Sequence, residues 1–299
     1  MSRERIHTWF AEVRRIWPLV PAAIYLTGFF IIVVVYLMGM SFTVAADGGA
    51  VSVSLAPVMR VLSMPDFREA LANTALFVMV GTPLELAVGL LLALMLYQPF
   101  ALRGFIRGLY VIPIAVPALV TATLFLILFD YPGGHINHLL LGKYQIFPAV
   151  ITVPLNWRSS KIFSLGISLL GKVWRDMPIS MLILLSGLNA IDPELFDAAK
   201  TMGAGLRRRL RHVILPLLLP SISAVVLLRS IEMWKEFIFP FVLAGRHHLL
   251  GTLIESLYND WGYSHEAAVV ALVLVACIVV CALCVLSMLD WCRKTLARV

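Results

Sequence analysis

The stretch of the chain that decides its fold reads Ile191-Asp-Pro-Glu-Leu-Phe-Asp-Ala-Ala-Lys-Thr-Met-Gly-Ala-Gly205 and continues as Leu206-Arg-Arg-Arg-Leu-Arg-His-Val-Ile-Leu-Pro216. Asp192 and Pro193 are typical of a helix start, because aspartate caps free backbone N–H groups and proline suits the first turn. The glycines after Met202 predict the end of this helix. We therefore expect a short polar helix from Asp192 to about Met202, then a second short, arginine-rich helix that leads back to Pro216.

Apolar runs on both sides are long enough to cross a bilayer, whose hydrocarbon core of about 30 Å takes about 20 helical residues. We predict an all-α integral membrane protein with six spanning helices, at residues 18–43, 70–97, 106–129, 172–190, 213–243 and 267–289. The membrane domain covers residues 18–292, between an N-terminal segment (1–17) and a tail (293–299). Prolines inside the third, fourth and fifth helices should kink them, namely Pro113, Pro117, Pro178, Pro220 and Pro240.

The composition excludes a soluble protein and argues against nucleic-acid binding. Of 299 residues, 61% are apolar and 14% are charged, and the mean hydropathy is +0.92. The net charge of +7 comes from lysines and arginines dispersed among apolar runs, so they form no basic domain. These residues concentrate on one side of the predicted spans, and the positive-inside rule places both termini in the cytoplasm.

A stripe of polar side chains marks the fifth predicted span. Arg229, Glu232, Met233 and Glu236 are spaced i, i+3, i+4 and i+7, which places them on one helix face. Charges at membrane depth are costly and normally face a bundle interior or a wet cavity. Two interpretations stay open: the stripe contacts a polar substrate, or Arg229 pairs with Glu232 and Lys235 with Glu236.

The second predicted span carries small residues and one acid at four-residue intervals. Gly81, Glu85, Gly89 and Ala93 share a face, which allows a neighbouring backbone to approach closely. We expect Glu85 to be the buried partner of a polar group on a neighbouring helix.

The polar stretch resembles the EAA loop of ABC importer permeases. That loop has Glu-Ala-Ala, three residues, Gly, nine residues, Ile, one residue, and Leu-Pro. Here Asp197-Ala-Ala, Gly203, Val213 and Leu215-Pro216 keep the spacing, with Asp for Glu and Val for Ile. Four further segments are similar to the corresponding segments of the carbohydrate (maltose-type) branch of these permeases, namely residues 83–89, 133–137, 173–178 and 188–196. One departure is that residues 244–248 replace a Gly-Gly-Pro loop found in many first permeases of this branch, so the role within a permease pair stays open.

The resemblance implies a type I ABC importer permease (MetI-like) bundle with a cytoplasmic coupling helix in the loop 191–216. It implies ATPase coupling through Asp197, Ala198, Ala199, Gly203, Ala204, Leu215 and Pro216. It implies sugar contacts at Arg229, Glu232, Met233 and Glu236, with further candidates Arg175, Asp176 and Ile179 at the start of the preceding span. No residue is expected to be catalytic, and no metal site is expected.

The resemblance also implies partners and a location. The chain would work with a second permease subunit in a heterodimer, two ATP-binding-cassette ATPases that bind ATP and magnesium, and an extracytoplasmic solute-binding protein. It would lie in the cytoplasmic membrane of a prokaryote, surrounded by lipid, and bind no cofactor itself. A polyol, a glycerophospho-compound or an amino acid remain alternative cargoes. A different class, an ion-coupled secondary transporter, would use Glu85 or Glu232 as its coupling carboxylate.

Overall fold

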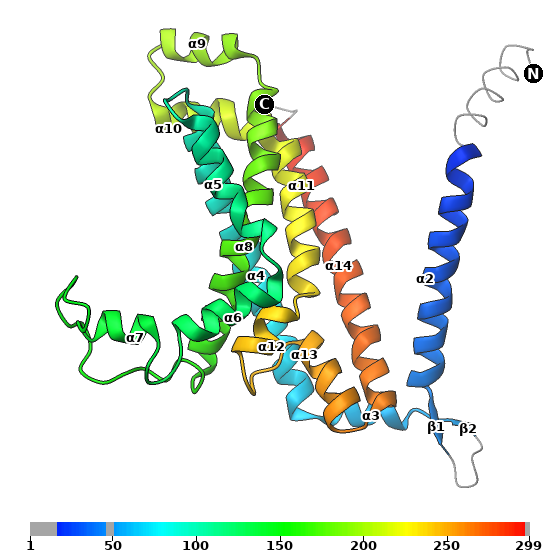
Figure 1. Ribbon diagram of the computed structural model, residues 1–299. Helices are drawn as coiled ribbons and strands as arrows, with labels where there is room; N and C mark the ends of the chain where they lie inside the picture. Colours follow the sequence, from blue (N-terminus) through cyan, green and yellow to red (C-terminus); the bar gives the residue numbers. More distant parts are fainter. Residues whose placement is uncertain (1–16, 46–50, 297–299) are drawn as a thin grey trace, which may run out of the picture.

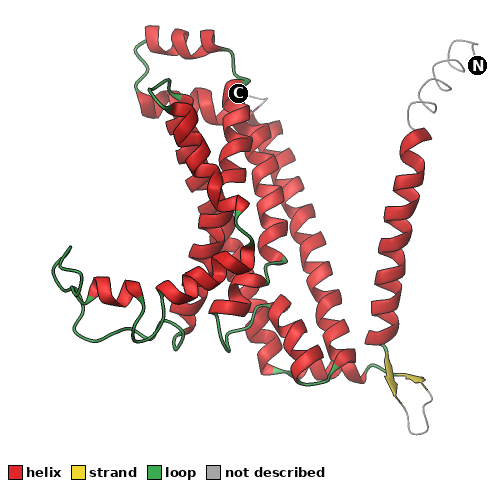
Figure 2. Ribbon diagram, in the orientation of Figure 1, coloured by secondary structure: helices red, strands yellow, loops and turns green. Residues whose placement is uncertain are grey.

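The computed structural model describes residues 17–45 and 51–296. Its elements, shown in Figures 1 and 2, are η1 (Trp17–Leu19), α2 (Val20–Ser41), β1 (Thr43–Ala45), β2 (Val51–Val53), α3 (Ala56–Ser63), α4 (Pro65–Tyr97), α5 (Arg103–Ala115), α6 (Ala118–Leu128), α7 (His135–Leu140), α8 (Lys161–Asn189), α9 (Pro193–Thr201), α10 (Leu206–Arg209), η2 (Leu210–Ile214), α11 (Leu215–Trp234), α12 (Ile238–Leu243), α13 (Leu250–Glu255), η3 (Ser256–Asp260) and α14 (Ser264–Leu296). Apart from a short antiparallel hairpin of β1 and β2, every described element is helical. The predicted segment 1–17 lies outside the described residues except for Trp17, as do residues 297–299 of the predicted tail.

Within residues 17–45 and 51–296, four helices are long and apolar enough to cross a membrane. They cover Trp17–Ser41, Pro65–Tyr97, Arg207–Trp234 and Ser264–Asp290. Two helix pairs, α5 with α6 and α8 with α9, meet the same criteria only when joined across a bend, and they raise the number to six. The predicted start of the fourth helix was too late, because α8 already begins at Lys161 rather than at residue 172.

The third predicted span, 106–129, is not one helix. The chain turns by 93° between α5 and α6. Val116 is extended, as expected for a residue that precedes a proline, and Pro117 has no N–H to donate to the preceding turn. Pro117 therefore breaks the span where only a kink was predicted, whereas Pro113 lies inside α5.

The fifth predicted span, 213–243, ends early. α11 stops at Trp234, and α12 begins only at Ile238. A continuous helix would bring Pro240 against the carbonyl of Glu236, where proline cannot donate a hydrogen bond. Instead, the Glu236 side chain accepts a hydrogen bond from the Phe239 backbone N–H, with N···O 3.2 Å. The break leaves Glu236 outside the helix.

The centre of the bundle consists of α4, α8 and α11, which lie side by side in Figure 1. The predicted small-residue face of α4 makes the close contact with α8: a Cβ at Gly89 would lie 2.6 Å from Ser180 Cβ. Glycine is therefore required there for the helices to approach. Leucines and Met181 of α8 fill the remaining interior together with Leu96 of α4 and Leu218 of α11.

The elements between the long helices gather at two ends of the bundle. Figure 1 shows α9, α10 and the start of α5 at one end, which we call the α9 end, and α3, α7, α12 and α13 at the other, the α7 end. α2 diverges from the bundle towards the α9 end. It is tied to the bundle at the α7 end, where His265 Nδ1 lies 2.8 Å from the Met40 carbonyl oxygen.

Candidate coupling helix and charge cluster

The short helix predicted from Asp192 to Met202 is present as α9. Asp192 Oδ1 accepts a hydrogen bond from the Glu194 N–H, with N···O 3.0 Å, and Pro193 occupies the first turn. One face of α9 rests on the bundle through Phe196 and Ala199, both buried, and the Phe196 ring lies 5.4 Å from the Tyr97 ring. The helix is thus fixed by its cap and by one apolar face.

The end of α9 is a Schellman motif centred on Gly203. The Gly203 N–H donates to the Lys200 carbonyl at 2.9 Å, and the Ala204 N–H donates to the Ala199 carbonyl at 3.0 Å. These two bonds need a left-handed residue between them, and Gly203 has φ +71°. No atom lies within 4 Å of a Cβ placed on Gly203, so glycine is needed for its backbone conformation and not for space.

The opposite face of α9 is open. Leu195, Ala198 and Met202 lie at i, i+3 and i+7 and are exposed, Leu195 by 46% and Met202 by 80%. Of the predicted coupling residues, Ala198 lies on this face, Asp197 is exposed and pairs with Lys200 at 3.0 Å, and Ala199 points into the bundle. The sequence interpretation missed Leu195 and Met202, although their helical spacing with Ala198 was readable.

The arginine-rich segment after Gly205 is not the separate short helix that we predicted. α10, the π-helical turn η2 and α11 follow one another without interruption, and a single apolar helix runs over Arg207–Trp234. The wider π turn accommodates Pro216, which cannot donate to the carbonyl one α-helical turn earlier. Leu215 and Pro216 therefore lie inside a continuous helix, where the π turn passes into α11.

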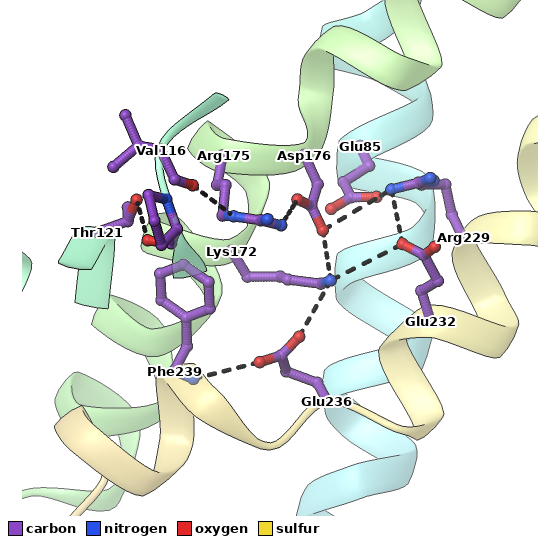
Figure 3. A network of polar contacts seen from close by, with 11 residues as sticks. Glu85, Val116, Thr121, Lys172, Arg175, Asp176, Arg229, Glu232, Glu236 and Phe239 are labelled. Atoms are coloured by element: carbon purple, nitrogen blue, oxygen red, sulfur yellow. Dashed lines mark hydrogen bonds and ion pairs between the residues drawn. The ribbon is translucent and has the colours of Figure 1, made fainter. Parts of the chain in front are cut away.

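Midway along the bundle, charged side chains of α4, α8 and α11 form a continuous cluster (Figure 3). On α8, Lys172 pairs with Asp176 and with Glu236, whose Oε2 lies 3.0 Å from Lys172 Nζ. Arg175 Nη1 lies 2.6 Å from Asp176 Oδ1, and its Nε donates to the Val116 carbonyl at 3.4 Å. Arg175 thus also binds a carbonyl freed by the break between α5 and α6.

Arg229 links the other two helices of the cluster. Its Nη1 lies 2.9 Å from Glu232 Oε2 and 3.8 Å from Asp176 Oδ2, and its Nε lies 3.7 Å from Glu85 Oε2. Arg229 and Glu85 are fully buried. The prediction that Glu85 pairs with a polar group on a neighbouring helix is confirmed.

The cluster contains one more acid than base. Three bases, Lys172, Arg175 and Arg229, face four acids, Glu85, Asp176, Glu232 and Glu236. Only two members are partly accessible: the side chains of Arg175 and Glu232 are 24% and 25% exposed. These two side chains are therefore the accessible part of the cluster.

The structure brings together five of the seven predicted substrate residues, namely Arg175, Asp176, Arg229, Glu232 and Glu236. Met233 is not among them: it is fully buried in an apolar group with Phe77 and Val173, against Gly81. Ile179, half-buried, has no charged group and takes no part in the ion pairs.

One of the two predicted ion pairs along the polar stripe is present and the other is not. The pair of Arg229 with Glu232 is present, but Glu236 pairs with Lys172 instead of Lys235. Lys172 was not predicted as a site residue. Its four-residue spacing from Asp176 was the signal that could have identified it.

The chain matches a described protein family over most of its length. The family of binding-protein-dependent transport system inner membrane components matches residues 85–298. The trehalose/maltose transport system permease protein MalF of Thermococcus litoralis is 31% identical over 231 residues, which cover 75% of this chain and 76% of that protein. The sulfoquinovosyl glycerol transport system permease protein SmoG of Agrobacterium fabrum is 31% identical over 224 residues, 72% of this chain and 70% of that one.

Solved structures share the fold. A chain of a bacterial ABC transporter involved in the import of the acidic polysaccharide alginate superposes with a TM-score of 0.73 at 15% identity, over 95% of this chain and 98% of that one. A chain of the alginate transporter in complex with an alginate pentasaccharide-bound periplasmic protein gives 0.76 at 16% identity, with the same coverage. The bundle is therefore a type I ABC importer permease fold, and this chain is a transport subunit that belongs to the family of binding-protein-dependent transport system inner membrane components.

Proposed function

We propose that this chain is one permease subunit of an ATP-binding-cassette importer and forms part of the translocation pathway for a sugar. The observation that carries the proposal is the open face of α9. Leu195, Ala198 and Met202 project from a helix that is capped at both ends and seated on the bundle by its other face. A rigid helix with a free apolar face suits insertion into a cleft of another protein.

The position of α9 in the chain explains how such a partner would act on the pathway. α9 lies between the end of α8 at Asn189 and the continuous helix that becomes α11. These two helices also carry most of the charge cluster. In this proposal α9 sits in a cleft of one ATPase subunit. Closure of the two ATPase subunits, which bind ATP and magnesium themselves, would move α8 relative to α11 and switch access to the cluster between the two sides of the membrane.

The cluster supports a cargo rich in hydroxyl groups. A hydroxyl both donates and accepts hydrogen bonds, so it can accept from Arg175 and donate to Glu232, the two accessible members. The relatives named for trehalose/maltose and sulfoquinovosyl glycerol transport favour a sugar or glycoside.

The remaining parts of the machine follow from the family and the charge distribution. An extracytoplasmic binding protein would deliver the cargo at the α7 end, and a second permease subunit would complete the pathway. Arginines of residues 207–211 and of α5 lie at the α9 end, which we place in the cytoplasm together with both termini. The membrane would be the cytoplasmic membrane of a prokaryote.

Co-purification from the native membrane tests this proposal. The tagged chain, extracted in mild detergent, should bring down an ATPase, a second permease and a binding protein, identified by mass spectrometry. Leu195→Arg, on the open face of α9, should lose the ATPase and keep the second permease. Ile146→Arg makes the same change at an exposed apolar residue outside α9 and should keep the ATPase. Recovery of the chain alone, active in liposomes without ATP, would contradict the proposal and favour an ion-coupled carrier.

A further inference from the structure

A cavity of about 600 Å³ lies behind α9, on the side turned towards the bundle. Its walls come from three elements that are distant in sequence: the last turns of α4, the bundle-facing side of α9, and the segment of α10 and η2. The volume falls in the range of small-molecule and lipid-headgroup sites. The cavity is separate from the charge cluster, because no charged residue of that cluster lines it.

The charged lining of the cavity carries one net positive charge. Arg209, Lys200 and Asp197 line it, and Asp197 is paired with Lys200 at 3.0 Å. The Nε atom of Arg209 is buried and has no hydrogen-bond partner among the described residues. A buried, unpartnered guanidinium donor is costly unless a ligand accepts from it, and a phosphodiester, with one negative charge and several acceptor oxygens, meets that need.

Apart from Tyr97 and Gln98, the rest of the lining is apolar and continues onto the outer surface of the bundle. Leu94 faces the cavity together with Leu91 and Met95, and these last two are also exposed on α4, one turn apart. α4 is long and apolar enough to cross the membrane, and this is its last part before the α9 end. From Leu91 to Tyr97 the helix rises about 9 Å, which spans the boundary between acyl chains and headgroups.

We propose that an anionic phospholipid occupies this cavity, with its phosphate on Arg209 and Lys200 and an acyl chain along Leu91, Leu94 and Met95. A soluble phosphate would satisfy Arg209 but would leave the apolar wall uncovered, so the lipid fits both halves of the site. Because the same cavity is lined by Phe196 and Pro193, the bound lipid also supports α9 from behind. The site does not depend on the proposed function of α9.

Native mass spectrometry of the purified full-length protein tests the site. The protein is incorporated in nanodiscs of phosphatidylcholine doped with phosphatidylglycerol, and the retained phosphatidylglycerol is counted after release. Wild type should retain it, and Arg209→Gln should retain about fivefold less, the effect expected for the loss of one cation near an anionic headgroup. Arg208→Gln removes the same charge from an exposed neighbour that does not line the cavity, and it should retain the lipid.

A second variant and a second readout keep the test decisive. Leu94→Trp fills the apolar side without changing charge and should also expel the lipid, even if Arg209→Gln folds poorly. Hydrogen exchange of residues 193–201 should slow when phosphatidylglycerol is added to wild type, and not in either variant. Equal retention by wild type, Arg209→Gln and Leu94→Trp would overturn the site. Displacement by inorganic phosphate alone would also overturn it, since it would show an anion site without a lipid.

Discussion

At the scale of single residues, the charge cluster shows how a membrane bundle holds ionised groups in its interior. Burying one charge costs several kcal/mol, and the cost is offset only by close opposite charges. Arg229, which is fully buried, contacts acids on α4, α8 and α11, and Lys172 contacts three acids, Asp176, Glu232 and Glu236. The pairs therefore fix the relative positions of α4, α8 and α11 at this level.

Removing the central cation should destabilise the bundle. Arg229→Met leaves Glu85, Asp176 and Glu232 without their shared partner, and the free energy of unfolding should fall by about 3 kcal/mol. Thermal unfolding in detergent measures this change. The double variant Arg229→Met/Glu85→Gln, which removes one of the abandoned charges, should recover part of the loss. A single variant as stable as wild type would show that the buried pairs do not hold the helices together.

The accessible members of the cluster should set the affinity for cargo, whereas the buried members should not. Glu232→Ala and Arg175→Gln each remove a hydrogen bond to a charged group, which corresponds to roughly a tenfold rise in the substrate concentration that gives half-maximal uptake. Glu236→Gln alters a buried partner of Lys172 and should leave that concentration unchanged. Uptake kinetics in proteoliposomes measure the half-maximal substrate concentration for all three variants. An unchanged concentration for Glu232→Ala would place the cargo elsewhere.

Helical spacing predicted one ion pair within a helix, whereas the partners across helices could not be named: Glu85 was expected to pair with a neighbouring helix, but Arg229 was not identified as its partner. The three-residue spacing of Arg229 and Glu232 predicted their ion pair correctly. The predicted pair of Lys235 with Glu236 was wrong because α11 ends at Trp234, so these two side chains no longer follow helical geometry. Lys172 was missed because the predicted fourth span started at that residue, which placed it at an edge instead of inside α8.

At the scale of elements, α9 depends on one backbone conformation. Gly203 is left-handed and unobstructed, so a replacement is penalised by its own φ and not by its neighbours. Gly203→Val should cost about 1–2 kcal/mol locally and unwind the last turn of α9. ATP-driven uptake should be largely lost while the chain still inserts. Gly203→Asn, which tolerates this region, should retain most of the uptake. If Gly203→Val took up solute at the wild-type rate, the shape of α9 would not be needed for coupling to ATP hydrolysis.

The ends of a helix could be predicted where capping residues and the length of the apolar run are enough to determine them. The Asp192-Pro193 start and the Gly203 end of α9 follow from local rules and were correct to within a residue or two. The breaks after Ala115 and Trp234 were not predicted, because a proline in an apolar run allows a kink or a break. The first break is stabilised by Arg175 of α8, which binds the Val116 carbonyl. The second is stabilised by the Glu236 side chain, which accepts a hydrogen bond from the Phe239 N–H across the break.

At the scale of the whole molecule, the two functional regions are joined by two helices. α8 and α11 both contribute to the charge cluster, pack closely near the α9 end at Gly187 and Ser221, and connect to the two ends of the α9 segment (Figure 1). We therefore predict that a movement imposed on α9 is transmitted along these packed helices. The family and the fold could be inferred from the spacing of the loop motif, whereas the transmission path required the positions of the charges in space.

ATP-driven accumulation tests the central claim most directly, that this chain couples an external ATPase to solute movement through α9. The purified complex is reconstituted in proteoliposomes, with ATP and magnesium on the α9 side and with labelled sugar and binding protein on the other. We predict that wild type accumulates the sugar above its external concentration only when ATP is present. Leu195→Arg, with the bundle intact, should abolish accumulation. Accumulation driven by a proton or sodium gradient without ATP, or normal accumulation by Leu195→Arg, would contradict the account.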